Sequence, residues 1–170
     1  MAAGLQLIDR EGIDGLKMRA LALKLGCDPM AIYHFVPNKA ALLEAITELL
    51  ERQASPPAGA TADWQTALQE YAANQLAVAL RHPKAIPLFT LRVSDNAATQ
   101  AAHAWLRELF EALRLPDTAA TVRLCTAGIN GVLLNYSVLQ GATGNAERIA
   151  KKMMREMVEA ICLHCTANRV

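Results

Sequence analysis

The sequence predicts an all-α protein, with an N-terminal helix-turn-helix domain of three helices and a larger helical domain after it. Hydrophobic residues make up 53% of the chain and aromatic residues only 5%, which is typical of helical globular proteins. Beyond residue 60, no stretch shows the period-two alternation of a β-strand. The segment 54–60 (ASPPAGA) has the composition of a loop. We therefore expect a first domain over residues 1–53 and a second over residues 61–170.

The first domain should begin with a helix over residues 1–11, which ends at Gly12. Its centre predicts two short helices, Met18–Leu25 and Pro29–Phe35, joined by a tight turn. Gly26 suits the left-handed end of the first of these helices, and Asp28 can cap the second, which Pro29 begins. A fourth helix, expected from Asn38 to about residue 53, carries a broad apolar face that should contact both domains.

The pattern of apolar residues predicts which side of the helix-turn-helix faces outward. We expect Ile32 and Phe35 to point into the core, where Leu21 and Leu25 are their partners. The outward positions are then Met30, Ala31, Tyr33 and His34.

The second domain is expected to contain five helices, separated by proline-, glycine- or aspartate-containing breaks. They should run from Thr61 or Asp63 to residue 81, from residue 84 to about 89, from Asp95 to about 113, from residue 117 to about 140, and from about 145 to 165.

Four stretches together resemble the DNA-binding domain of the tetracycline-repressor (TetR) family. They are residues 12–22 (GIDGLKMRALA), 25–26 (LG), 31–35 (AIYHF) and 38–43 (NKAALL). Residues 63–83 are more loosely similar to the C-terminal domain of the tetracycline-type members. The resemblance implies a transcriptional regulator, by default a repressor, that binds a palindromic double-stranded DNA operator as a homodimer and is released by a small molecule. By this resemblance, the sequence begins in the middle of the family's first helix. Either the start of the chain is assigned too late, or the basic segment that usually precedes this helix is absent.

The candidate DNA contacts are Lys17, Arg19, Pro29, Met30, Ala31, Tyr33, His34 and Lys39. Met30, Ala31 and His34 are suited to base edges, because the first two can touch a thymine methyl and the histidine can donate a hydrogen bond. The resemblance implies that Arg19, Tyr33 and Lys39 contact phosphates, which positions the protein rather than reading sequence. Lys17 stands where the family usually has a capping Ser or Thr.

Net charge leaves a second interpretation open. The chain carries a formal charge of +1, and residues 1–53 contain six Lys/Arg against seven Asp/Glu, a net of −1. DNA-binding domains are usually more basic than this. The alternative is therefore an all-helical module that binds a small molecule or another partner and whose DNA binding is weak or lost.

The second domain supplies candidates for a largely apolar effector pocket. They are Trp64, Leu68, Tyr71, Phe89, Trp105, Leu109, Asn130 and Asn135. For each of them taken alone, core packing is the competing interpretation. His103 could line a pocket or face solvent, whereas His82, before Pro83, is expected to be structural.

The resemblance to the TetR family implies that two copies pair through the last two long helices, and this chain supplies suitable surfaces there. Ala127, Gly128 and Gly131 allow close backbone approach in the helix over 117–140, and glycine inside a helix calls for such a packing reason. In the helix over 145–165, an apolar stripe comprises Ile149, Met153, Met157 and Ile161. The alternative is that this stripe belongs to the core of one subunit.

Nothing in the sequence indicates an enzyme, a cofactor or a membrane span. The serines Ser55, Ser94 and Ser137 stand in no nucleophile motif, and no apolar run approaches the length that crosses a bilayer. Cys162, His164 and Cys165 invite a metal-site interpretation but lack a fourth ligand. Four cysteines without a disulfide framework make a reducing cytoplasm the expected location.

Overall fold

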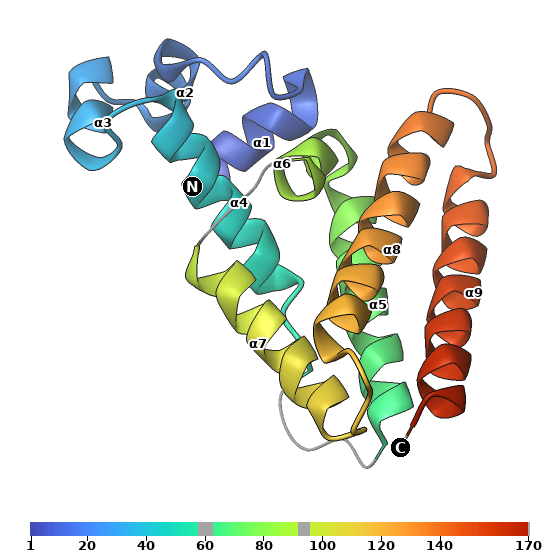
Figure 1. Cartoon of the computed structure of the whole chain (residues 1–170). Coiled ribbons are helices and arrows are strands. Elements are labelled where there is room, and N and C mark those ends of the chain that lie inside the picture. Colours follow the sequence, from blue (N-terminus) through green and yellow to red (C-terminus); the bar gives the residue numbers. More distant parts are fainter. Residues whose placement is uncertain (58–62, 92–95, 170) are drawn as a thin grey trace.

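The computed structural model describes residues 1–57, 63–91 and 96–169, and the regular elements in these ranges are helices (Figure 1). This confirms the expected all-α class. The elements are α1 (Ala2–Glu11), α2 (Met18–Leu25), α3 (Pro29–Phe35), α4 (Lys39–Gln53), α5 (Trp64–Arg81), the short 3-10 helix η1 (Pro83–Ala85), α6 (Ile86–Thr90), α7 (Ala97–Glu111), α8 (Thr118–Leu139) and α9 (Ala146–Ala167).

The helix-turn-helix begins and ends its helices where the sequence predicts. Gly26 follows α2 in the left-handed conformation, with φ of 65°. The Asp28 carboxylate then accepts a hydrogen bond from the backbone amide of Met30 at 2.7 Å. Asn38 caps α4 in the same manner, since its side chain accepts from the amide of Ala41 at 2.8 Å. These caps satisfy amides that a short helix would otherwise leave unpaired.

Side-chain caps also begin three helices of the second domain. Asp63 accepts from the amide of Thr66 at the start of α5, Asn96 caps α7, and Asp117 caps α8. The other expected starting residues, Thr61 and Asp95, lie outside the described residues.

Two apolar cores form, and the first one crosses the predicted domain boundary. The core around α1 to α4 includes the fully buried Ile8 and Ile46, but Val78, Ala85 and Leu88 of α5, η1 and α6 also belong to it. The second core joins α5 to α9. Residues 1–53 are therefore a distinct set of helices whose core is completed by the next domain.

Polar contacts also connect the two domains. The Nδ1 atom of His82 lies 3.0 Å from a carboxylate oxygen of Asp9, and the Lys84 ammonium donates to the backbone oxygen of Arg10 at 2.6 Å. The C-terminal end of α1 is thus held against the junction of α5 and η1. His82 is part of this structural contact, as the sequence predicts.

The predicted inward positions of Leu25 and Phe35 are wrong. Phe35 is 87% exposed and Leu25 is 54% exposed, whereas Leu21 and Ile32 are buried as expected. The helix ends at Phe35, and the next residue, Val36, adopts extended backbone and is buried. The small core under α3 is therefore filled by Ile32 and Val36, which leaves Phe35 outside.

Candidate nucleic-acid interface and ligand pocket

Helix α3 stands at one end of the molecule, where α2 packs against one of its sides (Figure 1). Its outer side carries Met30, which is 67% exposed, and Tyr33, which is 42% exposed. His34 is also exposed, and Ala31 and Pro29 are half-buried. A helix of seven residues is too short to be stable alone, so this exposed position depends on the caps and on Ile32.

The three predicted cationic contacts differ in their surroundings. Lys17 and Arg19 are exposed at the start of α2, and Lys17 makes no side-chain cap. The Lys39 ammonium instead donates to the backbone oxygen of Ile13 at 3.1 Å and is partly buried. Lys39 therefore ties the start of α4 to the segment between α1 and α2, a role that the sequence analysis missed.

The helix-turn-helix surface is more apolar than expected. Besides Met30, it exposes Leu23, Leu25 and Phe35, and the free thiol of Cys27 is exposed in the turn. An exposed set of large apolar side chains of this kind marks an interaction surface. The sequence feature that points to the exposure of Phe35 is its position at the end of a short helix.

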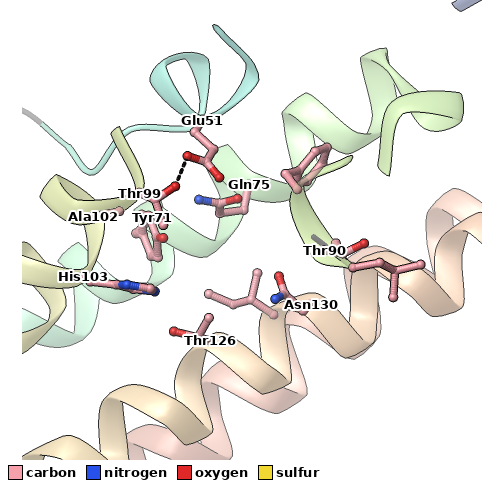
Figure 2. A pocket seen from close by; sticks show the side chains of 12 residues that line it. Glu51, Tyr71, Gln75, Thr90, Thr99, Ala102, His103, Thr126 and Asn130 are labelled. Atoms are coloured by element: carbon pink, nitrogen blue, oxygen red, sulfur yellow. Dashed lines mark hydrogen bonds between the residues drawn. The ribbon is translucent and has the colours of Figure 1, made fainter. Parts of the chain in front are cut away.

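A pocket of about 350 Å³ lies among α4, α5, α6, α7 and α8 (Figure 2). This volume is within the range of small-molecule sites. It is lined by Glu51, Tyr71, Gln75, Phe89, Thr90, Leu91, Thr99, Ala102, His103, Thr126, Ile129 and Asn130.

Three of the eight predicted ligand residues, Tyr71, Phe89 and Asn130, line this pocket. The other five lie elsewhere. Leu68 is completely buried in the second core, and Trp64, Trp105 and Leu109 pack against that core while partly exposed. Asn135 is exposed on α8. Trp105 supports the pocket indirectly, because its ring lies 5.2 Å from that of Tyr71.

The polar lining of the pocket was largely missed from the sequence. Glu51, Gln75, Thr90, Thr99 and Thr126 each belong to an amphipathic helix, where a polar residue usually faces solvent. His103, which could have faced either way, lines the pocket. The lining remains mostly apolar, and hydrogen-bonding groups are spread over several of its walls (Figure 2).

Glu51 links the pocket to the helix-turn-helix domain. It lies in the last turn of α4, and its carboxylate accepts a hydrogen bond from the Thr99 hydroxyl of α7 (Figure 2). Burial raises the pKa of Glu51 above its ordinary value, while the hydrogen bonds from Thr99 and Asn96 oppose this rise. Asn96 also donates a hydrogen bond to Glu44, which precedes Glu51 in α4. These side chains join α4 to the beginning of α7.

Comparison with known proteins identifies the first domain. The family model described as bacterial regulatory proteins, tetR family, matches residues 1–46. The HTH-type transcriptional repressor DrrR1 of Streptomyces coeruleorubidus is 38% identical over 82 residues, which is 48% of this chain and 30% of the relative. The class D tetracycline repressor protein of Escherichia coli is 40% identical over 84 residues, 47% of this chain and 38% of the relative. These matches therefore span only about a third of each relative's length.

The whole fold is also similar to solved structures. A TetR variant from Acinetobacter baumannii AYE in complex with minocycline superposes with a TM-score of 0.76 at 18% identity, covering 95% of this chain and 93% of that one. The first 46 residues thus match the tetR family. The all-helical fold of the whole chain, with a helix-turn-helix at its N-terminus, is similar to that of this solved structure.

The chain has an exposed stripe along α8. It comprises Leu124, Ala127, Gly131, Asn135 and Val138, which recur at helical spacings on the side away from the core. A methyl group added at Gly131 would meet open space, whereas one at Gly128 would lie 2.9 Å from the Met157 sulfur. Gly128 therefore serves packing of α8 on α9 within the chain, and Gly131 does not.

The predicted α9 stripe is divided between two environments. Ile161 is buried in the second core, so its inclusion in an outward stripe is wrong. Ile149, Met153 and Met157 are only partly buried, along the edge of α9. The core side of α9 is formed mainly by residues one position later, such as Met154 and Val158.

The C-terminal cysteines are buried rather than arranged around an ion. Burial raises the pKa of the Cys125 thiol to about 12 and that of Cys162 to about 11, which keeps both thiols protonated and poorly nucleophilic at neutral pH. Within 1–57, 63–91 and 96–169, no three His, Cys, Asp or Glu side chains are arranged to hold a metal. In the same ranges, no helix is long and apolar enough to cross a membrane.

Proposed function

We propose that this chain is a ligand-responsive transcriptional regulator, most simply a repressor, that binds a two-fold symmetric operator as a homodimer. The observation that carries the proposal is the exposed outer side of α3, held by the Asp28 cap and the buried Ile32. Regulators of this kind act where the chromosome is, which in bacteria is the cytoplasm. Binding and release involve no catalytic step, so the proposal requires neither an enzyme site nor a cofactor.

Helix α3 is the proposed recognition helix. Met30, Ala31 and His34 would contact base edges in the major groove, together with the newly found Phe35, because apolar groups discriminate thymine by its methyl. Lys17, Arg19 and Tyr33 would contact phosphates and set the position of the helix. Pro29 begins the helix, and Lys39 would support it through its bond to Ile13.

The exposed stripe on α8 is the proposed dimer interface, with the partly buried edge of α9 beside it. Ala127 and Gly131 let the backbones of two α8 helices approach closely, while Leu124 and Val138 supply apolar area. Dimerisation would place two copies of α3 on one side, and successive major grooves require a separation of about 34–36 Å.

Helix α4 is the proposed connection between effector and operator. Its residues Leu42 and Ile46 are buried in the first core, whereas Glu51 lines the pocket. A small molecule that moves Glu51 would therefore move the base of the helix-turn-helix. The related fold that binds minocycline supports a small-molecule site in this domain.

Fluorescence anisotropy with duplexes from the DNA flanking the gene tests the proposal. A regulator should bind one of them far more tightly than unrelated duplexes, with an affinity that falls as salt is raised. Equal and weak binding to every duplex would favour the alternative, a helical binding module without an operator.

Two substitutions in α3 test the assignment of contacts. Tyr33→Ala should weaken binding to all duplexes alike, by about tenfold for one lost phosphate contact, whereas His34→Ala should change the preference among operator variants. The opposite pattern would show that the two residues have exchanged roles.

A further inference from the structure

One ionisable acid lies inside the pocket, and it comes from the helix that carries the recognition domain. Glu51 projects from α4 toward α5, α7 and α8, and Gln75 lies beside it (Figure 2). Asn130 and Thr126 of α8 face these two residues across the pocket (Figure 2). A molecule that fills the space would therefore meet the Glu51 carboxylate at one of its sides.

In the part of the chain that the structure describes, no lysine or arginine lines the pocket around Glu51. Its hydrogen bonds there come from the neutral groups of Thr99 and Asn96, while the charge of Glu44 opposes its ionisation and His103 favours it. A carboxylate that is partly removed from water favours a positive partner. Burial is the main cause of the raised pKa of Glu51.

The remaining lining suits an aromatic cation. The rings of Tyr71 and Phe89 are part of the wall, and aromatic faces attract positive charge when water is excluded. Gln75, Thr126 and Asn130 add neutral hydrogen-bonding groups. The cationic side chains Arg107 and Arg123 line an adjoining hollow beyond His103, not the pocket itself.

We propose that the effector is an aromatic organic cation whose positively charged nitrogen pairs with Glu51. This inference rests on the proposed function and specifies its ligand class. A cation that pairs with Glu51 would break the hydrogen bond from the Thr99 hydroxyl to this carboxylate, which joins α4 to α7. Loss of this bond frees the last turn of α4 to shift relative to α7, and the helix-turn-helix would move with it.

The test uses shape-matched aromatic probes of different charge. Benzyltrimethylammonium, its neutral carbon isostere neopentylbenzene and the anion phenylmethanesulfonate form one set; tetraphenylphosphonium and tetraphenylborate form a larger pair. Binding to the full chain is measured by isothermal titration calorimetry. The cation of at least one set should bind about tenfold or more tightly than its uncharged or anionic counterpart, as expected for one charge-assisted contact.

Glu51→Gln keeps the size and hydrogen-bonding capacity of the side chain but removes its charge, so the preference for cations should disappear. Glu48→Gln is the matched control, because Glu48 lies on the same helix but pairs with Arg52 at the surface; it should keep the preference. Circular dichroism establishes that both variants are folded. The proposal is overturned if neutral or anionic probes bind as tightly as cations, if Glu51→Gln retains the preference, or if no probe of any charge binds.

A separate measurement distinguishes this inference from the proposed function. The cation that binds is added to the chain on its operator duplex, and release is followed by anisotropy. Cation binding by a chain that recognises no duplex would refute the regulator and leave the ligand class standing. Operator binding without a preference for cations would refute the ligand class and leave the regulator standing.

Discussion

The proposed recognition surface and the proposed effector pocket differ in how the chain builds them. The recognition surface comes from one continuous stretch, Lys17 to Lys39, whose turns and caps are set by neighbouring residues. The pocket gathers side chains from α4, α5, α6, α7 and α8, between Glu51 and Asn130. A locally specified surface can be altered one residue at a time, whereas a pocket assembled from distant helices responds to any change in how they pack.

The largest expected effect concerns the connection that both regions would share, the proposed dimer. Gly131→Arg places a long charged side chain on the exposed stripe of α8, where one subunit would otherwise meet its partner. We expect a monomer, measured by analytical ultracentrifugation, that loses operator affinity by about 100-fold or more, because only one recognition helix can then bind at a time. The fold should remain intact, since a side chain at this position meets open space in the single chain. A dimer that persists would place the interface elsewhere.

A core substitution tests whether the two regions unfold separately. Leu88 belongs to α6 but is buried in the first core, so Leu88→Ala should cost about 2–5 kcal/mol of unfolding free energy. Because this residue lies where the domains meet, urea denaturation should show one transition for both, shifted to lower urea. Fluorescence of the two tryptophans follows the unfolding of the second domain, and circular dichroism follows the unfolding of the whole chain. Two separated transitions would mean that the regions are independent units.

The local character of the recognition surface predicts a smaller, confined effect. Asp28→Ala removes the cap of α3 and should cost about 1 kcal/mol. Operator affinity should fall, while binding of a pocket ligand should remain as in the unaltered chain. Asp28→Asn serves as the control, because asparagine caps about as well as aspartate. If ligand binding were to weaken together with operator binding, the supposed separation would be wrong.

The smallest expected effect is a pH dependence caused by Glu51. Its carboxyl binds a proton more tightly in the folded chain than in the unfolded chain, where the ordinary value is 4.5. Stability from this group is therefore present at low pH and is lost as pH rises through the folded-state pKa. Urea melts from pH 4 to pH 8 should show Glu51→Gln gaining stability relative to the unaltered chain as pH increases. A constant difference across this range would mean that the pKa is not raised.

Sequence analysis was most successful where structure is local. The caps at Asp28 and Asn38, the turn at Gly26 and the ends of α2 and α3 follow from residues within four positions. Phe35 was misplaced because its burial depends on where the chain turns after α3, which helical periodicity does not report. Gly128 and Gly131 looked equivalent in sequence, and only the position of Met157 separates them.

The pocket was harder to predict for a related reason. Large apolar residues such as Leu68 were plausible wall residues, yet the core needed them. The polar residues Glu51 and Thr99 looked like solvent-facing positions, because nothing local indicates that α4 and α7 pack against each other there. Tyr71, Phe89 and Asn130 do line the pocket; whether they bind a ligand stays a prediction.

The contact between α1 and the junction of α5 and η1 has a practical consequence for protein engineering. Asp9 and Arg10 are held by His82 and Lys84. A chimaera that joins this helix-turn-helix domain to the effector domain of another protein would lose both contacts. Such a chimaera should transmit its signal poorly unless the residues on both sides of this contact are transferred together. The part of this protein that must be exchanged as one piece is thus larger than the proposed DNA-binding segment.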